Sequence, residues 1–535
     1  MANKTRLILP ILLVIAVLLF CLVILPNSQA SENLAMVTML EPDEGVVIPV
    51  MQRMISGGDT LKQTLGRFIV YEYYYYGLPF FGLGALVMLA LRGLGLESNF
   101  ALMMLVLRQV VSVLPTLAGL LVLTYIQDQF KTWRSIAIFL LLAIIPATLR
   151  NALWLHPDGL VIFFSAMVLY FLWKDDHQLG RHFYWAAAFC GVLTATKLVG
   201  LYFFLAVLAC LIWYMVKRQG KSKQVIKAGA FFIGLMLLCF LFSNAFLFSK
   251  YGRPQFLSTI IGQASWLADG YGIVYAKGLQ AVLPILKQDY GSVAFIGLAF
   301  ALTGFGIWQE RSRFHSALIL AWALSLSISV FFFTHFKYQY WLPVALPLFS
   351  SFALILPEKT KNSTLKRGLP LVVRMGLIVL VLIQGFLFIK TVGRIIDQRL
   401  SALDGNAAIT FYNESMLRLD HLKDKPQKVY YDYRLYFPPK ENWSAGTNYD
   451  LLDYRFIEEN DFTILMLSAQ RIADYLNPNV IGVDPDKFTE NQRFYRDAKA
   501  GKIVGYHLLY RDQKALLFIS QEVCLAEFPE ETCNP

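Results

Sequence analysis

The chain has 535 residues, of which 56% are hydrophobic, 15% aromatic and only 16% charged, and its mean hydropathy is +0.51. Soluble domains carry about 25% charged residues, so this composition excludes a soluble enzyme and a disordered chain and indicates a polytopic membrane protein. The net charge of +11 is unevenly distributed, because residues 391–535 carry −5 and the first 390 residues carry +16. A surplus of basic residues in the apolar part of a chain is typical of cytoplasmic loops in a membrane protein. Since the sequence has no nucleic-acid-binding motif, we expect no nucleic-acid partner.

The first predicted element is an apolar run from Leu7 to Pro26 that follows Lys4 and Arg6. About twenty apolar residues span the ~30 Å hydrocarbon core, whereas the apolar region of a signal peptide is usually ~7–15 residues. We therefore predict an uncleaved first transmembrane helix. The alternative is a cleaved signal peptide, for which Ser28 and Ala30 have the small side chains expected at the cleavage site.

Eleven further apolar runs follow, each bounded by charged residues. They lie at residues 77–91, 101–126, 135–152, 159–173, 183–197, 198–216, 228–249, 291–309, 317–334, 341–357 and 369–389. The run at 77–91 reaches only about 22 Å as a helix, so we predict an interfacial or re-entrant helix there; the alternative is an ordinary short crossing. The chain then crosses the membrane about 11 times as an α-helical bundle.

Basic residues collect in alternate loops between these runs. They are Lys131 and Arg134; Lys174 and Arg181; Lys217, Arg218, Lys221, Lys223 and Lys227; Arg311 and Arg313; and Lys359, Lys361, Lys366 and Arg367. Such loops face the cytoplasm. We therefore expect a multi-pass protein of the bacterial inner membrane with its N-terminus in the cytoplasm and its C-terminal tail on the extracytoplasmic side.

The tail from about residue 391 changes character. Residues 428–432 and 462–467 have the pattern of strands, and the stretches at 470–477 and 489–500 have the pattern of helices. We divide the chain into a transmembrane catalytic domain of residues 1–390 and an extracytoplasmic soluble α/β domain of residues 391–535.

Two of the six cysteines, Cys524 and Cys533, belong to this tail, and the other four lie in apolar segments. Because the tail is placed in an oxidising compartment, we predict a disulfide between Cys524 and Cys533. The alternative is a pair of free thiols in a frayed end.

Acidic residues are scarce in the first 390 residues, which contain only 15. Asp43 and Glu44 lie in the sequence Glu41-Pro-Asp-Glu-Gly45, about 15 residues beyond the first helix, and Asp158 lies in His156-Pro-Asp-Gly159. Both groups are predicted on the outer face. Their structural alternative is a turn or a helix N-cap, for which Asp is a common residue.

The same face receives Lys197, in Thr196-Lys-Leu, and the aromatic and basic stretch from His335 to Pro343, which contains Lys337 and Tyr340. Taken singly, Lys197 fits a lysine that extends to the headgroups, and Tyr340 fits an aromatic belt. The coincidence of carboxylates and cations on one membrane face favours a functional site.

The order of these features resembles the GT-C class of glycosyltransferases, and within it the protein O-mannosyltransferase and aminoarabinose transferase branch. The similarity covers most of residues 1–390 in layout: a first helix, an outer loop with Asp43-Glu-Gly45, a second outer Asp, a Thr-Lys hinge, a helix start at Tyr340-Trp-Leu-Pro343 and a soluble tail. Many relatives have a Tyr-Pro-Pro element where this chain has Tyr74-Tyr-Tyr-Gly-Leu-Pro79.

This resemblance implies that Asp43 is the catalytic carboxylate, Asp158 the second acidic position and Lys197 a lysine that contacts the donor phosphate. It implies a polyprenyl-phosphate-linked sugar as donor, membrane lipids as surroundings, and an acceptor that is a lipid, a glycan or a protein.

The chemistry of the residues supports the same roles. A carboxylate such as Asp43 takes the proton of an acceptor hydroxyl as it attacks the anomeric carbon, with inversion, and Glu44 and Asp158 orient the base or the acceptor. Cations stabilise the departing phosphate, and Lys197, Lys337 and Arg150 are the candidates.

His156 and Tyr340 are candidate substrate-binding residues. No cofactor is required, although His156, Asp158, Asp43 and Glu44 are also ligand types for a divalent metal.

Two other classes of function stay open. A secondary transporter also places charges in membrane segments, as at Arg108, Gln109 and Arg374. A non-catalytic subunit of a glycan assembly complex keeps the architecture and uses the tail to bind a partner.

Overall fold

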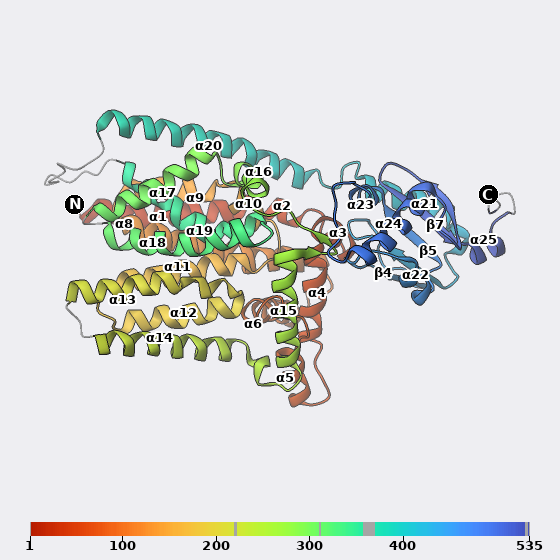
Figure 1. Cartoon of the computed structure of the whole chain (residues 1–535), viewed down its shortest axis with the longest axis horizontal. Coiled ribbons are helices and arrows are strands. Elements are labelled where there is room, and N and C mark those ends of the chain that lie inside the picture. Colours follow the sequence, from red (N-terminus) through yellow and green to blue (C-terminus); the bar gives the residue numbers. More distant parts are fainter. Residues whose placement is uncertain (1, 219–221, 310–311, 357–369, 530–532, 534–535) are drawn as a thin grey trace. The chain divides into compact units, whose positions relative to one another are not determined.

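The computed structural model describes residues 2–218, 222–309, 312–356, 370–529 and 533 (Figure 1). The chain forms two compact units. One comprises Met1–Ser28, Pro49–Gln263 and Lys277–Arg399, and the other comprises Gln29–Ile48, Ala264–Ala276 and Leu400–Pro535. Some basic residues of the predicted cytoplasmic loops lie outside the described residues: Lys221, Arg311, Lys359, Lys361, Lys366 and Arg367.

The first unit, called the helical unit below, is built from apolar helices joined by short turns. They are α1 (Ala2–Leu22), α2 (Ile24–Ser28), α5 (Leu61–Ile69), α6 (Leu78–Gly93), α7 (Phe100–Leu107), η1 (Arg108–Val113), α8 (Leu114–Asp128), α9 (Trp133–Ala143), α10 (Pro146–Ala152), α11 (Asp158–Lys174), α12 (Arg181–Thr196), η2 (Leu198–Phe203), α13 (Phe204–Arg218), α14 (Ser222–Ser243), η3 (Ala245–Phe248), α16 (Leu279–Asp289), α17 (Val293–Trp308), α18 (Arg313–Ile328), η4 (Ser329–Phe333), α19 (Tyr338–Ser350) and η5 (Ser351–Ile355). The boundary between the units falls inside α4 (Pro42–Met54), α15 (Gly252–Asp269) and α20 (Leu371–Leu400).

Six helical stretches among the described residues are long and apolar enough to cross a membrane. They are Leu7–Ser28, Phe100–Asp128, Leu198–Lys217, Ser222–Ser243, Arg313–Phe333 and Leu371–Leu400. Counting two bent pairs, α9 with α10 and α16 with α17, gives eight. The predicted multi-span helical architecture is therefore confirmed. The number of 11 crossings stays a prediction, since the runs at 159–173 and 183–197 form shorter helices, α11 and α12, of 17 and 16 residues.

Close helix packing fixes the positions of α11 and α12. Helix α12 packs against both α11 and α14, and α11 also packs against α8. Gly191 permits the contact between α12 and α14, because a Cβ there would lie 2.4 Å from the carbonyl oxygen of Met236. Small residues at helix contacts let two backbones approach in this way. In Figure 1, α12, α13 and α14 run side by side and α15 runs across their direction.

The predicted interfacial run at 77–91 forms α6, a helix of 16 residues that is not among the candidate spans. Gly77 and Leu78-Pro79 begin this helix, with Pro where the missing N–H has no intrahelical partner to lose. Its placement along the membrane surface stays a prediction.

The second unit is called the soluble unit below, because it contains the tail that the sequence predicts to be soluble. It contains a five-stranded mixed sheet with helices around it. Its elements are α3 (Leu34–Leu40), β1 (Gly270–Tyr271), β2 (Ile273–Val274), α21 (Ala407–Arg418), η6 (Asp420–Leu422), β3 (Gln427–Tyr431), β4 (Trp443–Gly446), α22 (Tyr454–Asn460), β5 (Ile464–Ser468), α23 (Ala469–Tyr475), α24 (Pro485–Ala500), β6 (Tyr506–Arg511), β7 (Ala515–Ser520) and α25 (Gln521–Glu527). The strand order is β4-β3-β5-β7-β6, with β4, β3 and β5 parallel and β7 antiparallel to both neighbours. The predicted strands and helices of the tail are confirmed as β3, β5, α23 and α24.

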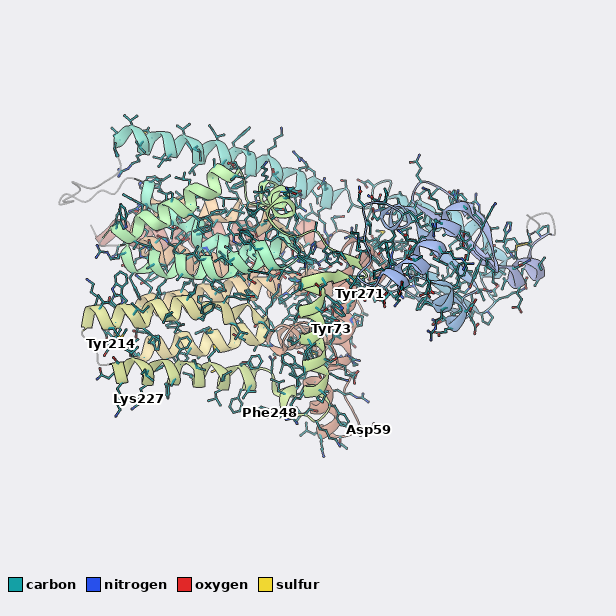
Figure 2. The ribbon with its side chains drawn as sticks, viewed as in Figure 1. Asp59, Tyr73, Tyr214, Lys227, Phe248 and Tyr271 are labelled. Carbon is teal, nitrogen blue, oxygen red and sulfur yellow. A yellow bond between two sulfur atoms is a disulfide. The ribbon has the colours of Figure 1, made fainter. Side chains whose placement is uncertain are left out.

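Two segments that precede the tail in the sequence belong to the soluble unit. The Asn33 amide donates to the Tyr436 hydroxyl at 3.3 Å, which attaches the segment of α3 to the loop after β3. The β1–β2 hairpin pairs with residues 481–483, and the hydroxyl of Tyr271, labelled in Figure 2, donates to Asp450 at 2.7 Å. The sequence division at residue 390 did not anticipate these attachments.

Cys524 and Cys533 form a disulfide with a Cα–Cα distance of 5.8 Å. Closing a loop of about ten residues is expected to stabilise the chain end by roughly 2–3 kcal/mol on the chain-entropy model. Intact mass after alkylation without reductant should therefore show no alkyl group on either residue. Two alkyl groups on the peptide that contains them would contradict the bridge, and reduction before alkylation is the positive control.

Candidate active site

Asp158 begins α11, and the local sequence fixes its position. Pro157 precedes it with φ −65°, so the chain enters the helix with Asp158 in the first turn, where the helix dipole stabilises a carboxylate. Gly159 lets α11 lie against η1, because a Cβ there would be 2.5 Å from the carbonyl oxygen of Ser112. The Ser112 hydroxyl also accepts from the His156 N–H at 3.3 Å.

Lys197 follows the last residue of α12 and has an extended backbone, with φ −157° and ψ 134°. The chain therefore breaks between α12 and η2 at this residue. The Lys197 side chain turns to Asp158 and donates from Nζ to Oδ1 at 2.8 Å.

Both oxygens of Asp158 have partners. Oδ1 accepts from Lys197, and Oδ2 lies 2.6 Å from Nδ1 of His156. The Asp158 side chain is 1% exposed and that of Lys197 is 19% exposed. Removing one partner of so buried a pair leaves an uncompensated charge and typically costs about 3–5 kcal/mol. Asp158 therefore holds Lys197 in place and offers no free oxygen to act as a base.

The role of Tyr76 was not predicted from the sequence, where this residue is only part of the stretch Tyr74-Tyr-Tyr-Gly-Leu-Pro79. Its hydroxyl lies 2.8 Å from Nε2 of His156. The two ring nitrogens of His156 therefore contact Tyr76 on one side and Asp158 on the other. Tyr76, His156, Asp158 and Lys197 thus form one continuous series of polar contacts.

Gly77 and Asn244 hold Tyr76 beside α12. The Gly77 N–H donates to the Thr196 carbonyl at 3.2 Å, and a Cβ at Gly77 would lie 1.6 Å from the carbonyl oxygen of Ala195. Asn244 accepts from the Leu78 N–H at 3.0 Å. Two features of the sequence could have indicated this arrangement. They are Gly77, which follows a run of tyrosines, and Asn244, which lies at the end of a long apolar helix.

Aromatic rings pack against two members of this series, His156 and Lys197. The Trp154 indole is stacked on His156 with centroids 4.1 Å apart, and the Lys197 ammonium lies 5.0 Å from the Tyr340 ring centroid. A cation over an aromatic face gains about 0.5–2 kcal/mol, depending on desolvation. Of the predicted residues, the structure thus brings together His156, Asp158, Lys197 and Tyr340.

Two predicted phosphate-binding cations have other surroundings. The Arg150 Nε lies 2.8 Å from the Asp289 Oδ1 in an ion pair, so its charge is already balanced. Lys337 directly precedes α19 and is exposed, and within the described part of the chain no contact of its ammonium with Asp158 or Lys197 is observed. Of the three predicted phosphate-binding cations, Lys197 is therefore the one whose contacts best fit that role.

Asp43 and Glu44 belong to the soluble unit and lie in the first turn of α4. Successive helical residues point about 100° apart, so the two carboxylates face different surroundings. Glu44 is 0% exposed, whereas Asp43 is half-buried. Asp43 is thus the more accessible of the two predicted catalytic carboxylates.

A metal site is not evident among the residues that the structure describes. No group of three or more His, Cys, Asp or Glu side chains in that part of the chain has an arrangement that fits a metal ion. The His156 and Asp158 pair is completed by the Lys197 ammonium instead of by a third ligand.

Comparison with solved structures identifies the fold. The crystal structure of ArnT from Cupriavidus metallidurans bound to undecaprenyl phosphate matches with a TM-score of 0.57 at 13% identity, over 95% of this chain and 97% of that chain. Its apo state matches with a TM-score of 0.53 at 14% identity, over 97% and 98%. No protein-family model matches the sequence, and the comparison with curated proteins found no match. The predicted resemblance to the GT-C class is therefore confirmed for the fold.

Proposed function

We propose that this protein transfers a sugar from a polyprenyl-phosphate donor to an acceptor hydroxyl at the membrane surface. The observation that carries the proposal is the half-buried Lys197, whose ammonium contacts both Asp158 and the Tyr340 ring in a fold shared with ArnT. ArnT was solved with undecaprenyl phosphate bound. A fixed ammonium group in a site of low water content is what a phosphate leaving group needs.

Lys197 acts on the phosphate in this proposal. As the bond between the anomeric carbon and the phosphate oxygen breaks, negative charge develops on that oxygen, and the ammonium stabilises it. Asp158 and His156 keep the ammonium in place, so little reorganisation accompanies the step. Asp158 is thus a positioning residue for the donor side.

Asp43 acts on the acceptor. Its carboxylate takes the proton of the acceptor hydroxyl, the hydroxyl oxygen attacks the anomeric carbon from the side opposite the phosphate, and the polyprenyl phosphate leaves with the bonding electrons. The product has the inverted configuration at the anomeric carbon. Glu44, buried beside Asp43, positions the first turn of α4.

The proposal also requires that the soluble unit lie outside the cytoplasm, as the basic loops predict. In a variant without its free cysteines, a cysteine placed at exposed Ala445 should react with a membrane-impermeant maleimide added to intact cells. A cysteine at exposed Lys131 should react only after the membrane is permeabilised. Labelling of position 131 in intact cells would contradict the predicted orientation. The same variant without an added cysteine is the control.

Mass spectrometry of lipids and glycans from cells with and without this protein tests the function itself. We expect the loss of one glycosylated product and the accumulation of the polyprenyl-phosphate sugar. A secondary transporter predicts instead that the donor accumulates on one membrane face with its glycosidic bond intact. Unchanged donor and product pools in the cells that lack the protein would contradict both.

A further inference from the structure

The soluble unit has an edge where three loops meet. Strands β3, β4 and β5 are parallel, so the residues that follow them emerge at the same end of the sheet. These are Asp432–Arg434 after β3, Thr447–Asp450 after β4 and Ala469–Arg471 after β5. The carboxyl ends of parallel strands are where open α/β sheets bind ligands.

A buried ion pair fixes these loops to each other. The guanidinium of Arg471 donates to Asp432 at 2.6 Å, and the two side chains are 6% and 0% exposed. The same guanidinium donates to the backbone carbonyls of Tyr449, at 3.2 Å, and of Asp450. Asp432 also accepts from the Ser468 N–H at 2.6 Å. The loops after all three strands are therefore held in one geometry.

Two tyrosine rings lie next to this ion pair. Tyr433 and Tyr449 have ring centroids 5.0 Å apart, and the Arg471 guanidinium lies 5.1 Å from the Tyr433 centroid. Tyr449 is 37% exposed. Arg434, next to Tyr433, has φ +70°, a left-handed conformation that is strained for this residue and is concentrated at functional sites.

Two segments outside the sheet adjoin the rings. Burial raises the pKa of Tyr275, and the hydroxyls of Tyr475 and Tyr433 add to this effect, so the segment after the β1–β2 hairpin lies near Tyr433. Burial also raises the pKa of Tyr449, and the carboxylate of Asp43 raises it further. Asp43 thus lies close enough to act electrostatically on the Tyr449 hydroxyl.

We propose that Tyr433 and Tyr449, with Arg434 and Asp450 at the rim, form a binding surface for a sugar ring of the acceptor, in the unit that also contains Asp43. The proposal rests on the proposed function, which makes Asp43 the group that meets the acceptor. It names the acceptor as a carbohydrate.

The chemistry of the surface favours a sugar over a peptide or an anion. Tyrosine faces pack against the apolar C–H face of a sugar ring, while the Arg434 guanidinium and the Asp450 carboxylate suit hydroxyl groups at its edge. A peptide side chain would need an apolar pocket, and these residues are polar or aromatic. An anionic headgroup would meet the carboxylates of Asp43 and Asp450.

The test uses the full chain in lipid nanodiscs with chitotriose and mannotriose as soluble probes. Saturation-transfer NMR should show contact with the sugar C–H protons for at least one probe. Replacing Tyr433 and Tyr449 together by Ala should weaken that binding at least tenfold, whereas replacing both by Phe keeps the ring faces and should change it less than twofold. Tyr510→Ala, on the far edge strand β6, is the matched control. The midpoint of thermal unfolding of each variant, compared with the wild type, reports folding.

Failure of this proposal can be told from failure of the proposed function. No saturation of either sugar by the wild type, or equal saturation in the double Ala variant, overturns the surface. Binding of inorganic phosphate, or of a Ser/Thr-containing peptide, that depends on the same two tyrosines would also overturn the proposal of a sugar-binding surface. If the sugars bind through Tyr433 and Tyr449 but the polyprenyl-phosphate donor is never cleaved, the surface stands and the proposed function fails.

Discussion

Lys197→Ala should lower kcat/KM for transfer by about 10²–10³-fold, which is the usual effect of removing one group that stabilises developing negative charge. The donor phosphate is charged before and during the reaction, so donor binding should weaken too. Steady-state rates measured against donor concentration, with purified protein in nanodiscs, check both effects. Lys174→Ala, at the opposite end of α11, is the matched control and should behave as the wild type.

Loss of folding must be separated from loss of the cation, because Lys197→Ala leaves Asp158 buried and unpaired. Asp158→Asn combined with Lys197→Met removes both charges at once and should restore thermal stability toward the wild-type value while transfer stays lost. If the double variant recovers transfer as well as stability, the ammonium has no role in the chemistry and serves the fold alone.

Asp43→Asn should lower the transfer rate by about 10²–10⁴-fold, because Asn keeps the size and most hydrogen bonding of Asp but cannot take a proton. Donor affinity should stay close to that of the wild type, which distinguishes this variant from Lys197→Ala. The measurement is initial rate under saturating donor, together with direct donor binding.

Asp59→Asn makes the same chemical change at an exposed position, labelled in Figure 2, and should leave the rate unchanged. Glu44→Gln should fall between Asp43→Asn and the wild type if Glu44 only positions α4. Wild-type turnover by Asp43→Asn would remove Asp43 from the mechanism and make Glu44 the next residue to test.

Much of the architecture follows from local sequence. Long apolar runs predict spans because lipid requires every backbone group to be bonded within the helix. Short apolar runs predict β3 and β5, and every residue of β5 is buried. Asp158 and Lys197 were predicted on one face from their positions at helix ends. The structure brings their side chains to 2.8 Å, a contact across 39 residues.

The remaining contacts depend on long-range packing that no local pattern reports. Tyr76 has the sequence context of a belt tyrosine, and only the approach of Gly77 to Ala195 places it against His156. Residues 29–48 join the soluble unit through contacts such as Asn33 with Tyr436, which are 403 positions apart. The ion pair between Arg150 and Asp289 likewise arises only from the fold, because the two residues are distant in the sequence.

The central claim is that this chain breaks the bond between a sugar and a polyprenyl phosphate. The most direct measurement incubates the purified full chain in nanodiscs with radiolabelled polyprenyl-phosphate sugars and acceptor extracted from its own cells, and follows release of free polyprenyl phosphate. We predict release by the wild type, with the sugar recovered on the acceptor, and at least a hundredfold less release by Asp43→Asn. Release no faster than with empty nanodiscs, or equal release by both proteins, would contradict the account.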